Sequence, residues 1–180
     1  MDRPDLGKHG ESGFTLVEVL IATVVMVTGL LSVAYGLGLG VAVIQTSTED
    51  TLARQKAREA MEDVFTARDD ARMTFDQVCN VGGGPNCIFV NGLTGLTTAG
   101  PDGIVNTADD GAIETVVTPG PDGILGTADD IQASLVGYQR SILVTQITPI
   151  LKQITVTIQY TTPQGLTRSV TLVALMSPYV

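Results

Sequence analysis

The feature that most constrains this chain is an apolar stretch from Phe14 to Ile44. It holds 31 residues and a single charge, Glu18. A helix rises about 1.5 Å per residue and needs ~20 apolar residues to cross a bilayer core of ~30 Å, so this stretch is long enough to span a membrane. The mean hydropathy of the 180-residue chain, +0.29, is high because of it. We therefore expect a single-pass membrane segment near the N-terminus.

The residues at the start of this stretch form a contiguous motif. A polar leader, residues 1–13, ends in Ser12-Gly13 and is followed directly by Phe14-Thr15-Leu16-Val17-Glu18. No small-residue cleavage site of a secretory signal peptide follows the apolar stretch. The motif resembles the type IV prepilin signature, in which a Gly precedes the cut, a Phe begins the mature chain and its fifth residue is Glu.

This resemblance assigns roles to three residues. It implies that a prepilin peptidase cuts after Gly13 and methylates the new amine of Phe14, and that Glu18 is the assembly residue. An ionised carboxylate in an apolar membrane helix costs roughly 2.5–3.5 kcal/mol on insertion scales, so Glu18 needs a partner. The α-amine of Phe14 on a neighbouring subunit would supply one. The alternative is a plain signal-anchor helix, in which Glu18 reaches the interface or favours the positive end of the helix.

The charge of the chain is concentrated in one region. The net charge is −9, from 10 basic and 19 acidic residues, and seven of the acidic residues lie in residues 100–130, which contain no Lys or Arg. Neutralising the phosphates of a nucleic acid needs clustered Lys and Arg. The sequence therefore shows no sign of nucleic-acid binding.

The same acidic region contains an internal repeat. Segments 100–110 (GPDGIVNTADD) and 120–130 (GPDGILGTADD) are identical at nine of eleven positions. Pro-Asp-Gly predicts a tight turn in each copy. Carboxylates without counter-charge repel one another unless water solvates them or a hard cation such as Ca²⁺ bridges them. The candidate calcium ligands are Asp102, Asp109, Asp110, Asp122, Asp129 and Asp130, and the alternative is a pair of solvated turns.

Two cysteines, Cys79 and Cys87, flank the turn-forming residues 80–86. In an oxidising compartment we expect them to close a disulfide loop, residues 79–87. The only histidine, His9, lies in the leader, so a zinc site or an activated thiol would lack a histidine in the mature chain. The sequence also lacks a Ser/His/Asp set and a phosphate-binding Gly-Lys-Ser/Thr loop. An enzyme is therefore not expected.

Residues 45–75 are charged and rich in Ala, and they predict an amphipathic continuation of the N-terminal helix. The residues that recur at helical spacing are Leu52, Ala57, Ala60, Met61, Val64, Phe65 and Arg68. The charged residues expected mostly on the solvated face are Glu49, Asp50, Arg54, Lys56, Glu62 and Asp63.

From Ser134 onward the apolar period changes to two, which is typical of half-buried strands. We expect antiparallel strands at 138–145, 152–160 and 166–176, with 114–118 as a candidate fourth. Their apolar faces need a cover, which the Ala-rich half of the helix supplies. Residues 76–180 are thus the expected globular β domain, and residues 14–44 the transmembrane or filament-core helix.

These patterns predict a pilin-like α+β fold with an Asp/Gly-rich loop insertion. The resemblance implies a structural subunit of a type IV pilus or type II secretion pseudopilus, and the acidic domain with its insertion favours a minor one. Its partners would be other pilin or pseudopilin subunits, the prepilin peptidase and the inner-membrane assembly machinery. The precursor would lie in the cytoplasmic (inner) membrane, and the mature chain in a periplasmic or cell-surface filament. The alternative is a membrane-tethered extracytoplasmic module that binds calcium or another ligand without assembling.

Overall fold

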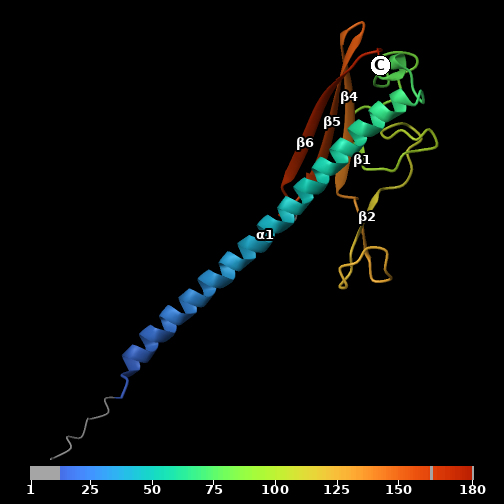
Figure 1. The fold of residues 1–180 in the computed structure, drawn as a ribbon. Helices are drawn as coiled ribbons and strands as arrows, with labels where there is room; N and C mark the ends of the chain where they lie inside the picture. The colour runs from blue at the N-terminus through green and yellow to red at the C-terminus, as the bar shows by residue number, and fades with distance from the viewer. Residues whose placement is uncertain (1–12, 163, 180) are drawn as a thin grey trace, which may run out of the picture. The chain divides into compact units, whose positions relative to one another are not determined.

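The structure is a computed structural model that describes residues 13–162 and 164–179. Apart from Gly13, the predicted leader lies outside the described residues. The chain divides into two compact units, which meet in sequence between Ile44 and Gln45. The elements are the helix α1 (Leu16–Asp69), the short 3-10 helix η1 (Phe75–Gln77) and the strands β1 (Thr94–Gly95), β2 (Thr115–Thr118), β3 (Ile131–Ser134), β4 (Tyr138–Thr148), β5 (Leu151–Thr161) and β6 (Thr167–Met176) (Figure 1).

The first unit contains the N-terminal part of α1. The most apolar 18-residue window of α1 has a mean hydropathy of 2.4, and none of it is buried within the chain. Hydroxyl groups in this part donate hydrogen bonds to backbone carbonyl oxygens of the preceding turn: Thr23 donates to Leu20 O at 2.8 Å and Ser32 donates to Thr28 O at 2.8 Å. Such bonds leave no hydroxyl hydrogen unsatisfied when water is excluded. By length and composition, α1 can therefore cross a membrane.

The second unit packs the C-terminal part of α1 against a four-stranded sheet of order β1-β4-β5-β6 (Figure 1). Every neighbouring pair is antiparallel, and in the centre Val156 of β5 lies between Ile142 of β4 and Leu172 of β6. The three strands predicted from the apolar period are confirmed, and β4 extends three residues farther than expected. The fold is the expected α+β arrangement of a long helix on an antiparallel sheet.

The core between these two layers is formed by every second side chain of β5 and by small side chains of α1. The even positions of β5, Lys152 to Tyr160, are buried, while the odd positions are half-buried or exposed. The buried residues of α1 are Ala53, Ala57, Ala60, Val64 and Ala67, at alternating steps of four and three. Leu52, Met61 and Phe65 of the predicted stripe pack only partly at its edge. The alanines allow the helix backbone to approach the sheet closely.

Two features differ from the expected arrangement. The candidate strand 114–118 is present as β2, but it pairs with β3 in a separate two-stranded sheet, and β1 takes the fourth place in the main sheet. The helix ends at Asp69 rather than near residue 75. Ala71 adopts a positive φ of 56°, and its N–H donates to Arg68 O at 3.2 Å, which closes the helix in the manner of a left-handed C-cap.

Lys56 was expected on the solvated face, and this expectation was wrong. Its side chain is 13% exposed, and Nζ lies 2.7 Å from Glu114 Oε2 and 2.9 Å from Glu59 Oε2. Burial alone lowers the pKa of Lys56, but the hydrogen bonds to the two carboxylates outweigh it and raise the pKa above its usual value. Arg140 joins the cluster at 3.3 Å from Glu114. This buried ionic cluster connects α1, β4 and the segment before β2.

Candidate functional site

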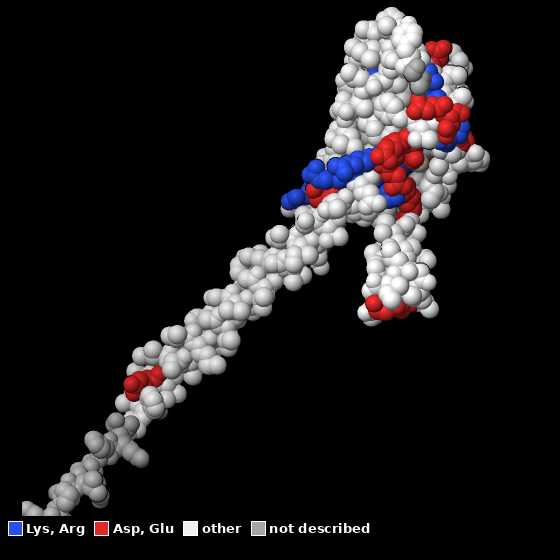
Figure 2. Space-filling model, in the orientation of Figure 1, with Lys and Arg blue, Asp and Glu red and all other residues white. Residues whose placement is uncertain are grey.

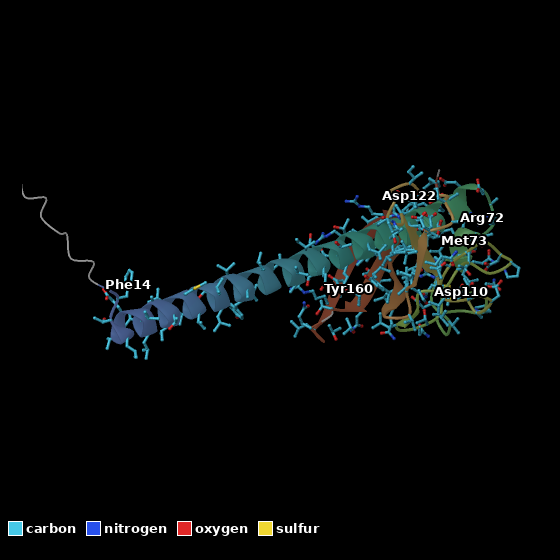
Figure 3. All side chains as sticks on the ribbon, turned by 90° about the horizontal axis from the view of Figure 1, so that it is seen from below. Phe14, Arg72, Met73, Asp110, Asp122 and Tyr160 are labelled. Atoms are coloured by element: carbon cyan, nitrogen blue, oxygen red, sulfur yellow. A yellow bond between two sulfur atoms is a disulfide. The ribbon has the colours of Figure 1, made fainter. Side chains whose placement is uncertain are left out.

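The N-terminal site begins at Gly13 and Phe14, which precede the first turn of α1. The Phe14 side chain is 86% exposed (Figure 3). Thr15 is the residue before the helix, and its N–H and hydroxyl donate to Glu18 Oε2 at 3.3 and 3.2 Å. Glu18 N–H donates back to Thr15 Oγ1 at 3.3 Å. The two residues form a reciprocal capping box, in which Glu18 satisfies the helix N-terminus.

Thr15 is a residue of this site that the sequence analysis did not single out. A signal was present, because Thr-x-x-Glu directly before an apolar helix is the sequence signature of a capping box. Both bonds from Thr15 go to Oε2, and Glu18 Oε1 accepts no hydrogen bond from the described residues. The carboxylate thus caps the start of the helix through Oε2.

The surface around this carboxylate is apolar. Figure 2 shows the N-terminal part of α1 as almost free of charged side chains. Leu16, Val17 and Leu20, within one turn of Glu18, are all more than half exposed. Exposed apolar surface of this extent is unfavourable in water. Lipid or neighbouring protein must therefore cover the apolar side chains of this unit.

Cys79 and Cys87 form a disulfide, as predicted, and the described residues contain no free cysteine. The bonded loop is fixed to the main sheet through Asn80. Its amide donates to Ile142 O at 2.7 Å, and its Oδ1 accepts from Val144 N–H at 2.7 Å. The disulfide loop therefore supports the free edge of β4 and has a structural part in the second unit.

In the first Asp-rich loop, residues 100–110, the carboxylates face backbone N–H groups of the same loop. Asp102 Oδ1 accepts from Ile104 N–H at 2.8 Å, and Asp110 Oδ2 accepts from Asn106 N–H at 2.9 Å. A 2.7 Å hydrogen bond from the Thr107 hydroxyl lowers the pKa of Asp109 below its usual value. The carboxylates of this loop stabilise its turns.

The second loop, residues 120–130, repeats this arrangement at the end of the β2–β3 hairpin. Asp122 Oδ1 accepts from Ile124 N–H at 2.8 Å, and the Thr127 hydroxyl lowers the pKa of Asp129. In residues 13–162 and 164–179, no three or more His, Cys, Asp or Glu side chains gather closely enough to hold a metal ion. Calcium binding by the six candidate aspartates stays a prediction.

Comparison with known families matches the N-terminal part of the chain. The prokaryotic N-terminal methylation motif matches residues 8–34, which include Gly13, Phe14 and Glu18. No curated protein and no solved structure matches the chain. The chain thus has a prepilin-type N-terminal methylation motif at the start of a long helix that packs against an antiparallel sheet, which is a pilin-like α+β fold.

Proposed function

We propose that this chain is a structural subunit of a type IV pilus or a type II secretion pseudopilus. The observation that carries the proposal is the methylation motif at the start of a helix whose large apolar side chains from Phe14 to Ile44 are all exposed. A filament core built from such helices would bury this surface, and it would exclude the water that the apolar residues avoid. The second unit would then face outward.

In this proposal a prepilin peptidase cuts after Gly13 and methylates Phe14. The cut creates a positive α-amine four residues before Glu18. The Glu18 carboxylate keeps Oε1 free of hydrogen bonds from the described residues, while Oε2 is held by Thr15. The amine of a neighbouring Phe14 would bind Oε1 and set the axial register of the subunits. An opposite charge in an apolar environment offsets the cost of the buried carboxylate.

The proposed location follows from the same residues. The precursor lies in the inner membrane through residues 14–44, with the prepilin peptidase and assembly machinery as its partners. The disulfide supports an oxidising compartment for the second unit, because such bonds persist outside the cytoplasm. The minor-subunit interpretation stays a prediction, which counting the copies per filament would test.

The test compares sheared filaments from a host that makes this chain with filaments from the same host without prepilin peptidase. The chain should appear in the filament fraction only when the peptidase is present. A Gly13→Leu variant should remain in the membrane fraction uncut, while a Gly29→Ala variant, changed in open space within the helix, should assemble. Assembly of the uncut Gly13→Leu chain would contradict the proposal.

A further inference from the structure

The two Asp-rich loops have one backbone structure. In each copy the first Gly accepts the hydrogen bond of a tight turn, at 2.9 Å from Gly103 N–H in loop 100–110 and 3.0 Å from Gly123 N–H in loop 120–130. Asn106 and Gly126, at equivalent positions, both adopt positive φ, 66° and 90°. Their N–H groups donate to the last Asp of their loop at 2.9 and 2.7 Å. Nine shared residues and the same bonds make the copies structural equivalents.

The surroundings of the copies differ completely. In loop 100–110, Ile104 and Val105 are 2% and 4% exposed and belong to the core of the second unit. At the equivalent positions of loop 120–130, Ile124 and Leu125 are 60% and 61% exposed. Asn106 is also fixed to its own domain, since its amide donates to Val90 O at 3.2 Å. Gly126 has no side chain for such a bond.

The electrostatic partners differ in the same way. Arg140 lies 3.5 Å from Asp110 Oδ2, and Arg72 donates to Gly103 O at 2.6 Å. Within the described residues, no Lys or Arg pairs with an Asp of loop 120–130, and Asp130 Oδ1 is shielded from solvent without a hydrogen-bond partner. Figure 2 shows these acidic side chains gathered at the tip of the β2–β3 hairpin. Loop 100–110 therefore has two kinds of contact that loop 120–130 lacks: burial of its apolar residues and a neighbouring guanidinium group.

The outer face of α1 in the second unit offers this chemistry. One hollow of about 380 Å³ includes Leu52 and Val116 in its lining, and a second hollow of about 700 Å³ includes Arg54 and Arg58. Thr51 and Gln55 line both, so the two hollows are adjacent along α1, and together we call them the α1 groove.

The charges along the α1 groove leave one guanidinium group available. Arg54 is paired with Asp50 at 2.7 Å, and Glu59 is held by Lys56 at 2.9 Å. Arg58 forms no ion pair within the described part of the chain. Glu62, which also lines the second hollow, lies one helical turn beyond Arg58. Arg58 is thus in a position to pair with an incoming carboxylate.

We propose that loop 120–130 of one copy of this chain docks in the α1 groove of a second copy. Ile124 and Leu125 enter the hollow beside Leu52 and Val116, and the exposed carboxylates of the loop, Asp122 and Asp129, face Arg58. The docked loop repeats between copies the apolar and guanidinium contacts that loop 100–110 makes within its own chain. The inference rests on the proposed filament role, which brings copies side by side, and it requires at least two neighbouring copies.

The test uses two differently tagged full-length chains made together in the host, one with Leu125→Cys and one with Gln55→Cys. Because the new cysteines are on different copies, a cross-link that carries both tags joins two molecules. Mild oxidation of sheared filaments should give this mixed dimer. The matched control replaces Gln55→Cys by Val173→Cys, which is also an exposed position but lies on β6, and should give little dimer.

Two further variants separate docking from chance proximity. Arg58→Glu in the Gln55→Cys chain should lower the dimer yield by about tenfold, since it places like charges at the contact. Arg168→Glu, an exposed arginine on β6, should leave it unchanged. Ile124→Ser in the Leu125→Cys chain keeps the backbone bonds of the loop and should lower the yield similarly, whereas Val173→Ser should not.

The outcomes distinguish this inference from the proposed function. Chains present in filaments with no dimer above the Val173 control would overturn the docking and leave the filament role intact. Cross-linking of Leu125→Cys to a different subunit would also overturn it, and so would a dimer yield that Arg58→Glu does not change. Absence of the wild-type chain from the filament fraction would overturn both.

Discussion

Thr15 and Glu18 cap the first turn of α1 reciprocally, at 3.2–3.3 Å, with both donors of Thr15 on one oxygen of the Glu18 carboxylate. A cut after Gly13 leaves this pair intact, because both residues belong to the mature chain. The part that the carboxylate has in starting the helix is therefore separable from its proposed pairing with a neighbour.

The first prediction separates these roles. Glu18→Gln retains an oxygen that accepts from Thr15 and removes the charge, so the cap remains while the pairing with an amine is lost. We expect normal membrane insertion and cleavage, with incorporation into sheared filaments reduced about tenfold or more. The matched variant Thr15→Val removes the side-chain cap and keeps the charge, and it should still assemble. Normal incorporation of the Gln variant would refute a role for the charge.

The second prediction concerns Lys152, whose buried Nζ donates to Phe75 O at 2.7 Å and Val78 O at 2.9 Å. Lys152→Met preserves the apolar stem but leaves two buried carbonyls without a donor, which costs about 2 kcal/mol. The melting temperature should fall by roughly 4–8 °C for a chain of this size. Arg168→Met on the exposed surface is the control. Equal melting of both variants and wild type would show that the buried bonds contribute nothing to stability.

The third prediction is a pH dependence in the first loop. The Thr107 hydroxyl holds the pKa of Asp109 below its usual value, so this carboxylate contributes stability above pH ~4 that is lost as pH falls through its folded pKa. Thr107→Val should raise the pKa of Asp109 and leave that of Asp129, bound by Thr127, unchanged. Carboxyl NMR titration measures both groups. A Thr127→Val variant should give the reverse pattern, and no change in either variant would remove the hydroxyl as the cause.

Much of the fold could be predicted because the sequence patterns that indicate it are local. The alternation from Lys152 to Tyr160 directly reflects which side chains face α1. Glu18 was recognisable as the single charge in an apolar stretch. Both patterns extend over many residues, so a single exception does not obscure them.

The remaining features depend on contacts between distant segments. Lys56 pairs with Glu114, 58 positions away, and no local pattern indicates that its charge is buried. Strand β1 is two residues long, too short for a periodic signal. The two Asp-rich loops are nearly identical in sequence, yet Ile104 and Val105 of the first are buried while Ile124 and Leu125 of the second are exposed, because burial depends on where the flanking strands place each loop.

The fourth prediction tests the calcium hypothesis. A cation bound only by the folded chain stabilises it by mass action, by about 2.7 kcal/mol at a concentration 100 times the Kd. Calcium should therefore raise the melting temperature of the full-length chain in detergent, and a chelator should reverse the effect. Asp122→Asn and Asp102→Asn identify the loop responsible. Identical melting with calcium and with chelator would exclude a stabilising calcium site.

The central claim is prepilin processing, and the most direct measurement is the mass and sequence of the N-terminal peptide of the protein from its host's membrane and filament fractions. The account predicts a peptide in the filament fraction that begins at Phe14 and carries one methyl group on its amine. The same fraction should contain no peptide from residues 1–13. A chain that begins at Met1 in both fractions, in a host with a working prepilin peptidase, would contradict the account.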